Sequence, residues 1–246
     1  MTRTALITGG TSGIGLATAQ TLAARGYAVV VTGRNPRTLA DAERALPAGV
    51  RVERADAGSV ADADRLATDL GNRFGALDVV LLNAAVEHPA PLDGIDEAGF
   101  DEQFAVNVKG QYFLLQKLLP LLGPGSSVIF MSSTGAQHGL PGLAVYCATK
   151  GAQVALARSL AVELAPRGIR VNAITLGPVD TPALTKLGMP ADELDAFKKT
   201  ITARVPLGRF GTAQEIADAV AFLASPEATY VTGATMMVSG GFGVAA

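Results

Sequence analysis

A tyrosine and a lysine, Tyr146 and Lys150, are four residues apart at the start of an apolar helical run. Residues at i and i+4 lie on one face of a helix, so the two side chains are expected one turn apart. A phenol with a pKa of ~10 exchanges protons poorly at pH 7, and a nearby ammonium group lowers that pKa. The spacing predicts a tyrosine acid or base tuned by a lysine. Alone, it also fits a packed tyrosine and a solvated lysine on a surface helix.

The first thirty residues contain a glycine-rich turn between an expected strand and an expected helix. Residues 4–7 form a short apolar run, TGGTSGIG follows at 8–15, and a helical pattern then continues to Gly26, before the next strand at 28–31. Glycines in such a turn allow a tight bend, a close approach to a pyrophosphate and close helix packing. The helix N-terminus would offer free N–H groups and a positive dipole end to phosphates. This unit predicts a dinucleotide site.

The end of the second expected strand indicates which dinucleotide binds. An acidic residue there would accept a hydrogen bond from the ribose 2′-hydroxyl of NAD, and this chain has Thr32-Gly33-Arg34 instead. Because arginine pairs with phosphate bidentately, the sequence favours NADP(H). The alternative is that Arg34 is a solvated loop residue and that NAD(H) binds.

Strands and helices alternate along the rest of the chain. Helices are expected over 36–46, 59–74, 100–122, 146–166 and 212–224, and strands over 50–53, 77–82, 127–131, 169–175 and 235–238. This alternation is typical of a parallel sheet covered on both faces. The expected fold is α/β, a Rossmann-like doubly wound three-layer αβα sandwich with a mostly parallel, seven-stranded sheet. Residues 1–246 are expected to form one catalytic domain, with a substrate-covering segment at about 182–210 that contains no strand.

Polar residues follow the carboxyl ends of the expected strands, where open α/β sheets bind ligands. Ser132 and Ser133 lie at the end of the fifth strand, and Asn83 follows the fourth. Asn107 interrupts the apolar pattern of the 100–122 helix and needs hydrogen-bond partners if it is buried. It either braces the helix or belongs to the site.

Composition excludes several classes of protein. Apolar residues make up 49% of the 246 residues and charged residues 17%, which excludes a disordered chain. The formal net charge is −2 without a basic run, so no nucleic-acid partner is expected. Cys147 is the single cysteine, and no apolar run reaches the ~18 residues of a membrane helix. We expect a cytoplasmic protein without a metal site or membrane contact.

Several motifs, in this order and spacing, resemble the short-chain dehydrogenase/reductase family. They are TGGTSGIG at 8–15, Asn83-Ala84-Ala85, Asn107, Ser133, Tyr146-Cys147-Ala148-Thr149-Lys150 and RVNAITLGPVDT at 170–181. The likeness extends from Thr4 to Gly241, and the family serine, thirteen residues before the tyrosine, is Ser133. Small departures at Leu82, Ala85, Leu176 and Ser239 remove no catalytic group. The resemblance implies a carbonyl reductase or alcohol dehydrogenase that assembles as a homotetramer or dimer.

The resemblance also implies a role for each site residue. Tyr146 would protonate the carbonyl oxygen or take the hydroxyl proton, and Ser133 would hydrogen-bond that oxygen. Lys150 would lower the tyrosine pKa and bind the nicotinamide ribose, and Asn107 would hold a water linking Lys150 to solvent. Asp56 would face the adenine amine, and Val179 and Thr181 the carboxamide. The residues matching cofactor-contacting positions are Gly9, Thr11, Ser12, Gly13, Ile14, Gly15, Arg34, Asp56, Ala57, Asn83, Ala84, Tyr146, Lys150, Gly177, Val179 and Thr181.

The substrate is expected to be a ketone or aldehyde, or the corresponding alcohol, of modest size. Positions that would line its pocket are Val86, Glu87, His88, Gln137, His138, Leu140, Pro178, Leu184, Leu187, Met189, Leu194 and Phe197. Alternatives are an NAD(H)-dependent dehydrogenase of a sugar, steroid or hydroxy acid, a 3-oxoacyl-carrier-protein reductase, a sugar-nucleotide epimerase and a non-catalytic dinucleotide-binding scaffold. Arg167 matches one arginine that would receive an acidic carrier protein. The position of the other is Pro124, which weakens such docking.

Overall fold

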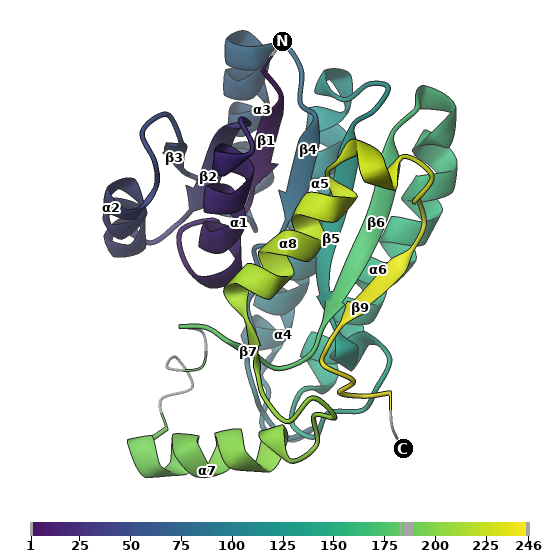
Figure 1. Ribbon diagram of the computed structural model, residues 1–246. Coiled ribbons are helices and arrows are strands. Elements are labelled where there is room, and N and C mark those ends of the chain that lie inside the picture. Colours follow the sequence, from purple (N-terminus) through teal and green to yellow (C-terminus); the bar gives the residue numbers. More distant parts are fainter. Residues whose placement is uncertain (1, 183, 185–188, 245–246) are drawn as a thin grey trace.

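The protein is an open parallel sheet with helices on both faces (Figure 1), in a computed structural model that describes residues 2–182, 184 and 189–244. Seven strands form the sheet, all paired in parallel. In spatial order they are β3 (Arg51–Arg54), β2 (Ala28–Gly33), β1 (Thr4–Ile7), β4 (Val79–Leu82), β5 (Ser127–Ser133), β6 (Arg170–Leu176) and β9 (Thr235–Val238). The order reverses between β1 and β4, which is where such sheets bind ligands.

The two faces of the sheet carry separate hydrophobic cores. One core packs the strands against α3 (Val60–Phe74), α5 (Gly110–Leu118) and α6 (Ala144–Leu164). The other packs them against α1 (Gly13–Ala24), α2 (Pro36–Ala45) and α8 (Ala213–Leu223). The expected doubly wound three-layer α/β sandwich with a seven-stranded sheet is therefore confirmed.

Helix starts follow the capping chemistry of the sequence. The Ser59 hydroxyl accepts a hydrogen bond from the Asp62 N–H at 3.1 Å and begins α3. Thr212 and Glu215 form a reciprocal capping box at the start of α8. Asn35 caps α2, which begins at Pro36, where the missing N–H is not needed. These local signals explain why the expected starts of α2, α3 and α8 agree with the structure to within one residue.

One expected helix is broken. The 100–122 segment consists of α4 (Glu97–Phe104), a π-helical turn at Ala105–Lys109, and α5, followed by a short 3-10 turn. The extra residue of the π turn changes which side chains face the sheet, and Asn107 lies inside it. The expectation of one continuous helix was therefore wrong at the position that the sequence marked as unusual.

The 182–210 segment contains a helix that the sequence analysis did not predict, α7 (Ala191–Thr202), which has no buried residue. On either side of α7, β7 (Val179–Asp180) and β8 (Gly211–Thr212) form a separate parallel pair. Both strands lie outside 182–210, and the described part of that segment contains no strand, as expected. Figure 1 shows α7 lying beyond the carboxyl ends of the main strands.

Candidate functional site

The glycine-rich turn brings the backbone between β1 and α1 to the end of the sheet. Gly9 has a φ of +62° and Gly13 a φ of +53°, which favour glycine. A Cβ on Gly15 would lie 2.4 Å from the carbonyl oxygen of Gly9, so no larger residue fits. Ser12 precedes α1, and its side chain makes no capping hydrogen bond. The N–H groups of the first turn face out of the helix end and fit a phosphate of a dinucleotide.

Two further predicted cofactor residues extend from this turn. Thr11 lies over the end of β2, where a Cβ on Gly33 would come within 2.7 Å of its methyl carbon. The Thr11 hydroxyl donates to Thr38 Oγ1 at 3.1 Å, which connects the turn to α2. Ile14 is partly buried against the core on this face of the sheet. These contacts hold the turn against the sheet and its helices.

The loop after β6 lies against the same helix end. A Cβ on Gly13 would be 3.5 Å from the Thr181 Cβ, which places Thr181 beside the N-terminus of α1. Gly177 packs so closely on β9 that a Cβ would lie 2.6 Å from the Ser239 Cα. Val179 pairs with Gly211 in the small β7–β8 ladder. The structure therefore brings the two distant motifs of the sequence, at 8–15 and 170–181, to one place.

Asn83 at the end of β4 braces the glycine turn. Its amide nitrogen donates to the carbonyl oxygens of Thr8 and Gly9, each at 3.0 Å. The Thr8 hydroxyl in turn accepts from the N–H groups of Asn83 and Ala84, at 2.9 and 3.1 Å. A Cβ on Gly9 would lie 2.9 Å from the Ala84 Cα, so the two backbones are in contact. The Asn83 side chain thus shapes the cofactor loop through hydrogen bonds to the protein.

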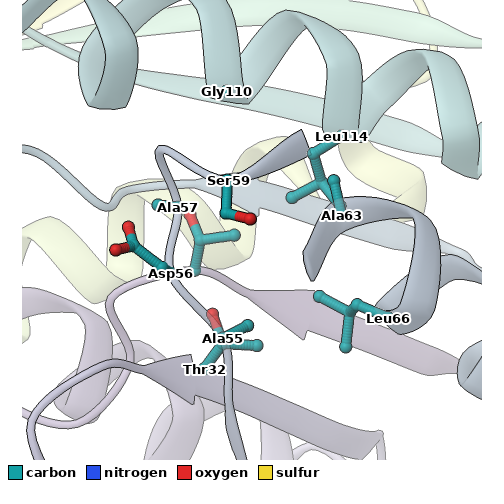
Figure 2. A pocket seen from close by; sticks show the side chains of 10 residues that line it. Thr32, Ala55, Asp56, Ala57, Ser59, Ala63, Leu66, Gly110 and Leu114 are labelled. Atoms are coloured by element: carbon teal, nitrogen blue, oxygen red, sulfur yellow. The ribbon is translucent and has the colours of Figure 1, made fainter. Parts of the chain in front are cut away.

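A small cavity lies under the loop that carries Asp56 and Ala57 (Figure 2). Its volume of about 10 Å³ suits about one water, so it is a packing gap between β2, α3 and α5. The loop approaches α5 so closely that a Cβ on Gly110 would lie 1.7 Å from the Ala57 carbonyl oxygen. Figure 2 shows the Asp56 carboxylate pointing away from this cavity. Asp56 Oδ1 accepts from the Gly58 N–H at 2.9 Å, which fixes the turn.

Arg34 follows β2 and lies between two carboxylates. Its Nη2 donates to Glu102 Oε1 at 3.0 Å, and its Nη1 lies 3.9 Å from Asp56 Oδ2. The Arg34 side chain is 54% exposed, so a ligand can reach it. The sequence predicted a helix that contains Glu102, but it did not show that this helix lies next to Arg34.

Tyr146 and Lys150 both lie near the start of α6, one turn apart. Lys150 is 2% exposed, and its Nζ donates to the Met131 carbonyl oxygen at 2.9 Å. The same Nζ lies 5.3 Å from the centre of the Tyr146 ring. Burial lowers the pKa of Lys150 to about 8, which the negative charge of Glu87 partly opposes. The predicted juxtaposition of phenol and ammonium is present.

The expected direction of the Tyr146 pKa is not found in the structure. Burial raises the pKa of the phenol, the negative charge of Glu87 raises it further, and a hydrogen bond with Ser133 acts in the opposite direction. Because the Lys150 ammonium group is directed to the Met131 carbonyl oxygen, it does not offset the burial. The phenol is therefore protonated at neutral pH.

The two serines at the end of β5 have different partners. The Ser132 hydroxyl is buried and donates to the Lys150 carbonyl oxygen at 2.9 Å, so it fastens α6 to the sheet. The Ser133 hydroxyl is partly exposed and accepts from the Gly135 N–H at 3.2 Å. A Cβ on Gly135 would lie 3.6 Å from the Ser133 Oγ and 2.9 Å from the Cys147 Sγ, so Ser133 lies beside α6. Ser133 is the serine that faces the tyrosine.

Asn107 is fully buried and makes hydrogen bonds with each of its polar groups. Its Oδ1 accepts from the Val86 N–H and its Nδ2 donates to the Val86 carbonyl, both at 2.8 Å. The Nδ2 also donates to the Thr149 hydroxyl at 3.0 Å. The Asn107 carbonyl accepts from Gln153 Nε2 at 2.8 Å. Bracing of the loop after β4 against α6 accounts for all of these bonds.

Two glutamines that the sequence analysis missed extend this network. Gln153 and Gln111 are 0% and 2% exposed, and Gln153 Nε2 donates to Gln111 Oε1 at 3.0 Å. Gln111 Nε2 donates to the Ala84 carbonyl at 2.9 Å, so the chain of amides ends at the cofactor loop. Both residues interrupt apolar helical patterns, as Asn107 does, and that signal was available in the sequence.

Glu87 is an acidic residue whose charge shifts the pKa values of both Tyr146 and Lys150. It keeps solvent contact, and desolvation of its carboxylate raises its pKa, while the charge of Lys150 lowers it. The residue before it, Val86, forms hydrogen bonds with the Asn107 side chain through both its backbone N–H and its carbonyl oxygen. The sequence analysis predicted only that Glu87 lines the substrate pocket. The structure adds its electrostatic interaction with Tyr146 and Lys150.

A larger cavity of about 570 Å³ lies beyond the loop after β5. It is lined by His138, Gly139, Leu140, Ala203, Arg204, Val205, Pro206, Phe242 and Gly243. Leu140 also lies against Gly135, which connects this cavity to the side of Ser133. Of the expected pocket positions, His138 and Leu140 therefore line a cavity, and Leu187 falls outside the described residues.

Within residues 2–182, 184 and 189–244, no cluster of three or more His, Cys, Asp or Glu side chains could hold a metal ion. Among the same residues, none of the helices is both long and apolar enough to cross a membrane.

Comparison with known proteins places this arrangement in a family. The family model "Enoyl-(Acyl carrier protein) reductase" matches residues 9–243. The chain is 35% identical to the uncharacterized oxidoreductase YmfI of Bacillus subtilis, over 98% of this chain and 99% of that protein. It is 38% identical to the 3-oxoacyl-[acyl-carrier-protein] reductase FabG of Staphylococcus aureus, over 98% of both chains.

A solved structure agrees with this result. The crystal structure described as a short-chain dehydrogenase/reductase, glucose/ribitol dehydrogenase, from Brucella melitensis superimposes with a TM-score of 0.91 at 33% identity, over 98% of this chain and 96% of that one. These similarities extend over nearly the whole chain. The chain belongs to the short-chain dehydrogenase/reductase family of NAD(P)-dependent oxidoreductases that act on CH–OH groups.

Proposed function

We propose that the protein is an NADP(H)-dependent oxidoreductase that interconverts a ketone or aldehyde and an alcohol, with Tyr146 as general acid or base. The main supporting observation is that Tyr146 and Lys150 lie one turn apart at the start of α6, with Ser133 beside them at the end of β5. A bound dinucleotide would supply or accept the hydride. The residues of the chain would hold the substrate oxygen and move its proton.

Reduction requires a proton for the oxygen as a hydride adds to the carbonyl carbon. The Tyr146 phenol is protonated at neutral pH and therefore has the proton to give, but its transfer needs a nearby positive charge to lower the raised pKa. The Ser133 hydroxyl would donate to the same oxygen and stabilise its developing negative charge. The tyrosinate left behind would regain a proton from solvent, and oxidation of the alcohol would reverse each transfer.

Lys150 would bind the nicotinamide ribose and favour the tyrosinate. With a pKa of about 8 it is mostly charged at pH 7. An ammonium group has three donors, and the Met131 carbonyl takes one of them. The carbonyl of Asn107 accepts one bond from Gln153, and its second lone pair would hold the water of a relay to Lys150.

The preference for NADP(H) rests on Arg34. No acidic residue ends β2, and the Arg34 guanidinium is half exposed near the Asp56 loop. A 2′-phosphate would pair with it, and the glycine turn would bind the pyrophosphate. Asp56, Ala57, Gly177, Val179 and Thr181 would complete the cofactor site.

The substrate would extend from Ser133 toward the cavity beyond the loop after β5. Leu140, Val205, Pro206 and Phe242 make much of that lining apolar, with His138 and Arg204 as its polar members. We include the 182–210 segment, with α7, as a cover of the substrate site within one domain of residues 1–246. A ketone or secondary alcohol of modest size fits this lining.

Reduction of a carrier-protein substrate is less well supported. Arg167, the matching arginine, donates to the carbonyl oxygens of Leu119 and Leu122 at 2.8 and 3.2 Å. Its guanidinium therefore caps the end of the α5 segment, and Pro124 offers no second cation. Because the S. aureus relative is a 3-oxoacyl-[acyl-carrier-protein] reductase, this activity remains an alternative to be tested.

Self-association is also proposed, as a homotetramer or dimer. Phe100 and Tyr112, on α4 and α5, are 44% and 39% exposed, and Val162 on α6 is 77% exposed. These apolar side chains would be covered in an assembly of identical chains. The sedimentation coefficient of the purified protein measures the number of subunits directly.

A panel of ketones, aldehydes and alcohols, assayed with NADPH and NADH at the nicotinamide absorbance band, tests the proposal. We expect turnover of at least one apolar ketone, with a higher kcat/KM for NADPH. Arg34→Ala should weaken NADPH far more than NADH, whereas Arg44→Ala, at the end of α2, should affect neither. Equal loss of both cofactors in Arg34→Ala would contradict the NADP(H) assignment.

A further inference from the structure

Arg34 is already paired before any cofactor arrives. Its Nη2 donates to Glu102 Oε1 at 3.0 Å, and the Asp56 carboxylate is more distant, at 3.9 Å. Glu102 belongs to α4, whereas Arg34 directly follows β2. The nearest acceptor of Arg34 is therefore a side chain 68 residues away in the sequence.

The Glu102 carboxylate is held in place from its other side. Its Oε2 lies 2.8 Å from His88 Nε2, so the two oxygens have separate partners. The hydrogen bonds with His88 and Arg34 lower the pKa of Glu102, so the group is ionised at neutral pH. The ionisable groups facing it are Arg34 and His88, with Asp56 beyond the guanidinium.

A 2′-phosphate on Arg34 would compete with this ion pair. Glu102 takes a donor on Nη2, so a phosphate that binds bidentately through this edge of the guanidinium would displace the carboxylate. The displaced carboxylate would remain near a group of like charge. NAD(H), which lacks the 2′-phosphate, neither displaces Glu102 nor brings a phosphate next to its charge. The ionised Glu102 thus acts selectively against one of the two dinucleotides.

We propose that Glu102 is a coenzyme-specificity residue, which holds Arg34 across the adenosine end of the site and must be displaced by a 2′-phosphate. This inference rests on the proposed binding of the 2′-phosphate by Arg34. It predicts that NADP(H) affinity is set by the strength of the Arg34–Glu102 pair. NADH affinity is independent of that pair.

The test is binding of NADPH and NADH to the substrate-free protein, followed by nicotinamide fluorescence. Glu102→Gln should lower the Kd of NADPH about two- to five-fold, the range expected for a half-exposed ion pair, and leave the Kd of NADH unchanged. Asp101→Asn is the matched control, because it removes one exposed negative charge from the same helix. An unchanged Kd of NADPH in Glu102→Gln, or an equal gain for both cofactors, would overturn the proposal.

The double variant Arg34→Ala/Glu102→Gln separates displacement from simple repulsion. If Glu102 acts by occupying Arg34, the gain from Glu102→Gln should disappear in the Arg34→Ala background. An undiminished gain there would show repulsion alone and would refute the displacement. Arg34→Ala by itself tests the proposed function, so a selective loss of NADPH in that variant with no gain in Glu102→Gln would reject only the present inference.

Discussion

The two sides of the proposed site differ in how they are held. On the α5 and α6 side, Asn107, Lys150 and Gln153 are at most 2% exposed. Gln153 donates to the Asn107 carbonyl oxygen at 2.8 Å, and Lys150 donates to the Met131 carbonyl oxygen at 2.9 Å. On the other side, α7 has no buried residue, and the salt bridge from Lys198 to Asp180, at 3.0 Å, is exposed. Buried hydrogen bonds fix the geometry of the α5 and α6 side of the site. The proposed cover is held only by surface contacts, so we expect it to change with the substrate.

Replacing a leucine by alanine in α5 and in α7 should give the largest difference between the two sides, measured as the free energy of unfolding. Leu118→Ala, at a fully buried position of α5, should lower the free energy of unfolding by about 2–5 kcal/mol. Leu194→Ala, at a partly exposed position of α7, should lower it by less than about 1 kcal/mol and raise the KM of the substrate. Urea unfolding of both variants measures this, and equal losses would show that α7 is part of the core.

The next effect concerns the two serines of β5. Ser133→Ala should reduce kcat about 100-fold, because the substrate oxygen loses a donor as negative charge develops on it. Ser132→Ala should instead lower stability by about 1 kcal/mol, because its bond to the Lys150 carbonyl is structural. Steady-state kinetics and unfolding curves of both variants check the assignment. A larger fall in kcat for Ser132→Ala would exchange the two roles.

Gln153→Leu tests the buried network itself. It should cost about 1–3 kcal/mol of stability, because the Asn107 carbonyl and Gln111 Oε1 lose their donor. Gln116→Leu, the same change at an exposed position of α5, should stay within about 0.5 kcal/mol. A loss no larger than that of Gln116→Leu would mean that the glutamines do not brace the site.

Lys150→Met should change the free energy of unfolding least among these variants, and by an amount that depends on pH. The folded pKa of about 8 is below the ordinary 10.5, so the buried ammonium destabilises the fold below pH 8, and this cost disappears as the pH rises from about 8 to 10.5. The stability of Lys150→Met relative to the natural protein should therefore fall by about 1 kcal/mol between pH 7 and pH 9. Lys109→Met, an exposed control, should show no such change. A pH-independent difference would contradict the burial of a charged Lys150.

Local signals in the sequence predicted the sheet, most helix starts and the position of the glycine turn. Thr212 and Ser59 begin helices as expected because a cap depends on a few neighbouring residues. The π turn around Asn107 could not be predicted, since it depends on contacts with Val86 and Gln153, which are far away in the sequence.

Electrostatics were predicted less well than geometry. The spacing of Tyr146 and Lys150 correctly placed the two groups together, but the direction of the phenol pKa depends on burial and on where the ammonium group points. Likewise, the sequence predicted that Arg34 follows the second strand, whereas its pairing with Glu102 required the fold. Charges respond to all neighbours in space, and most of those come from other parts of the chain.

The claim that the fixed side of the site carries the proton chemistry is tested most directly by Tyr146→Phe. The measurement is single-turnover oxidation of prebound NADPH on mixing with a ketone, together with the Kd of NADPH. We expect the rate to fall by about 100- to 10,000-fold while the Kd changes less than about two-fold, because the phenol is needed only for proton transfer. A variant that keeps more than about a tenth of the rate would contradict the acid–base role of Tyr146.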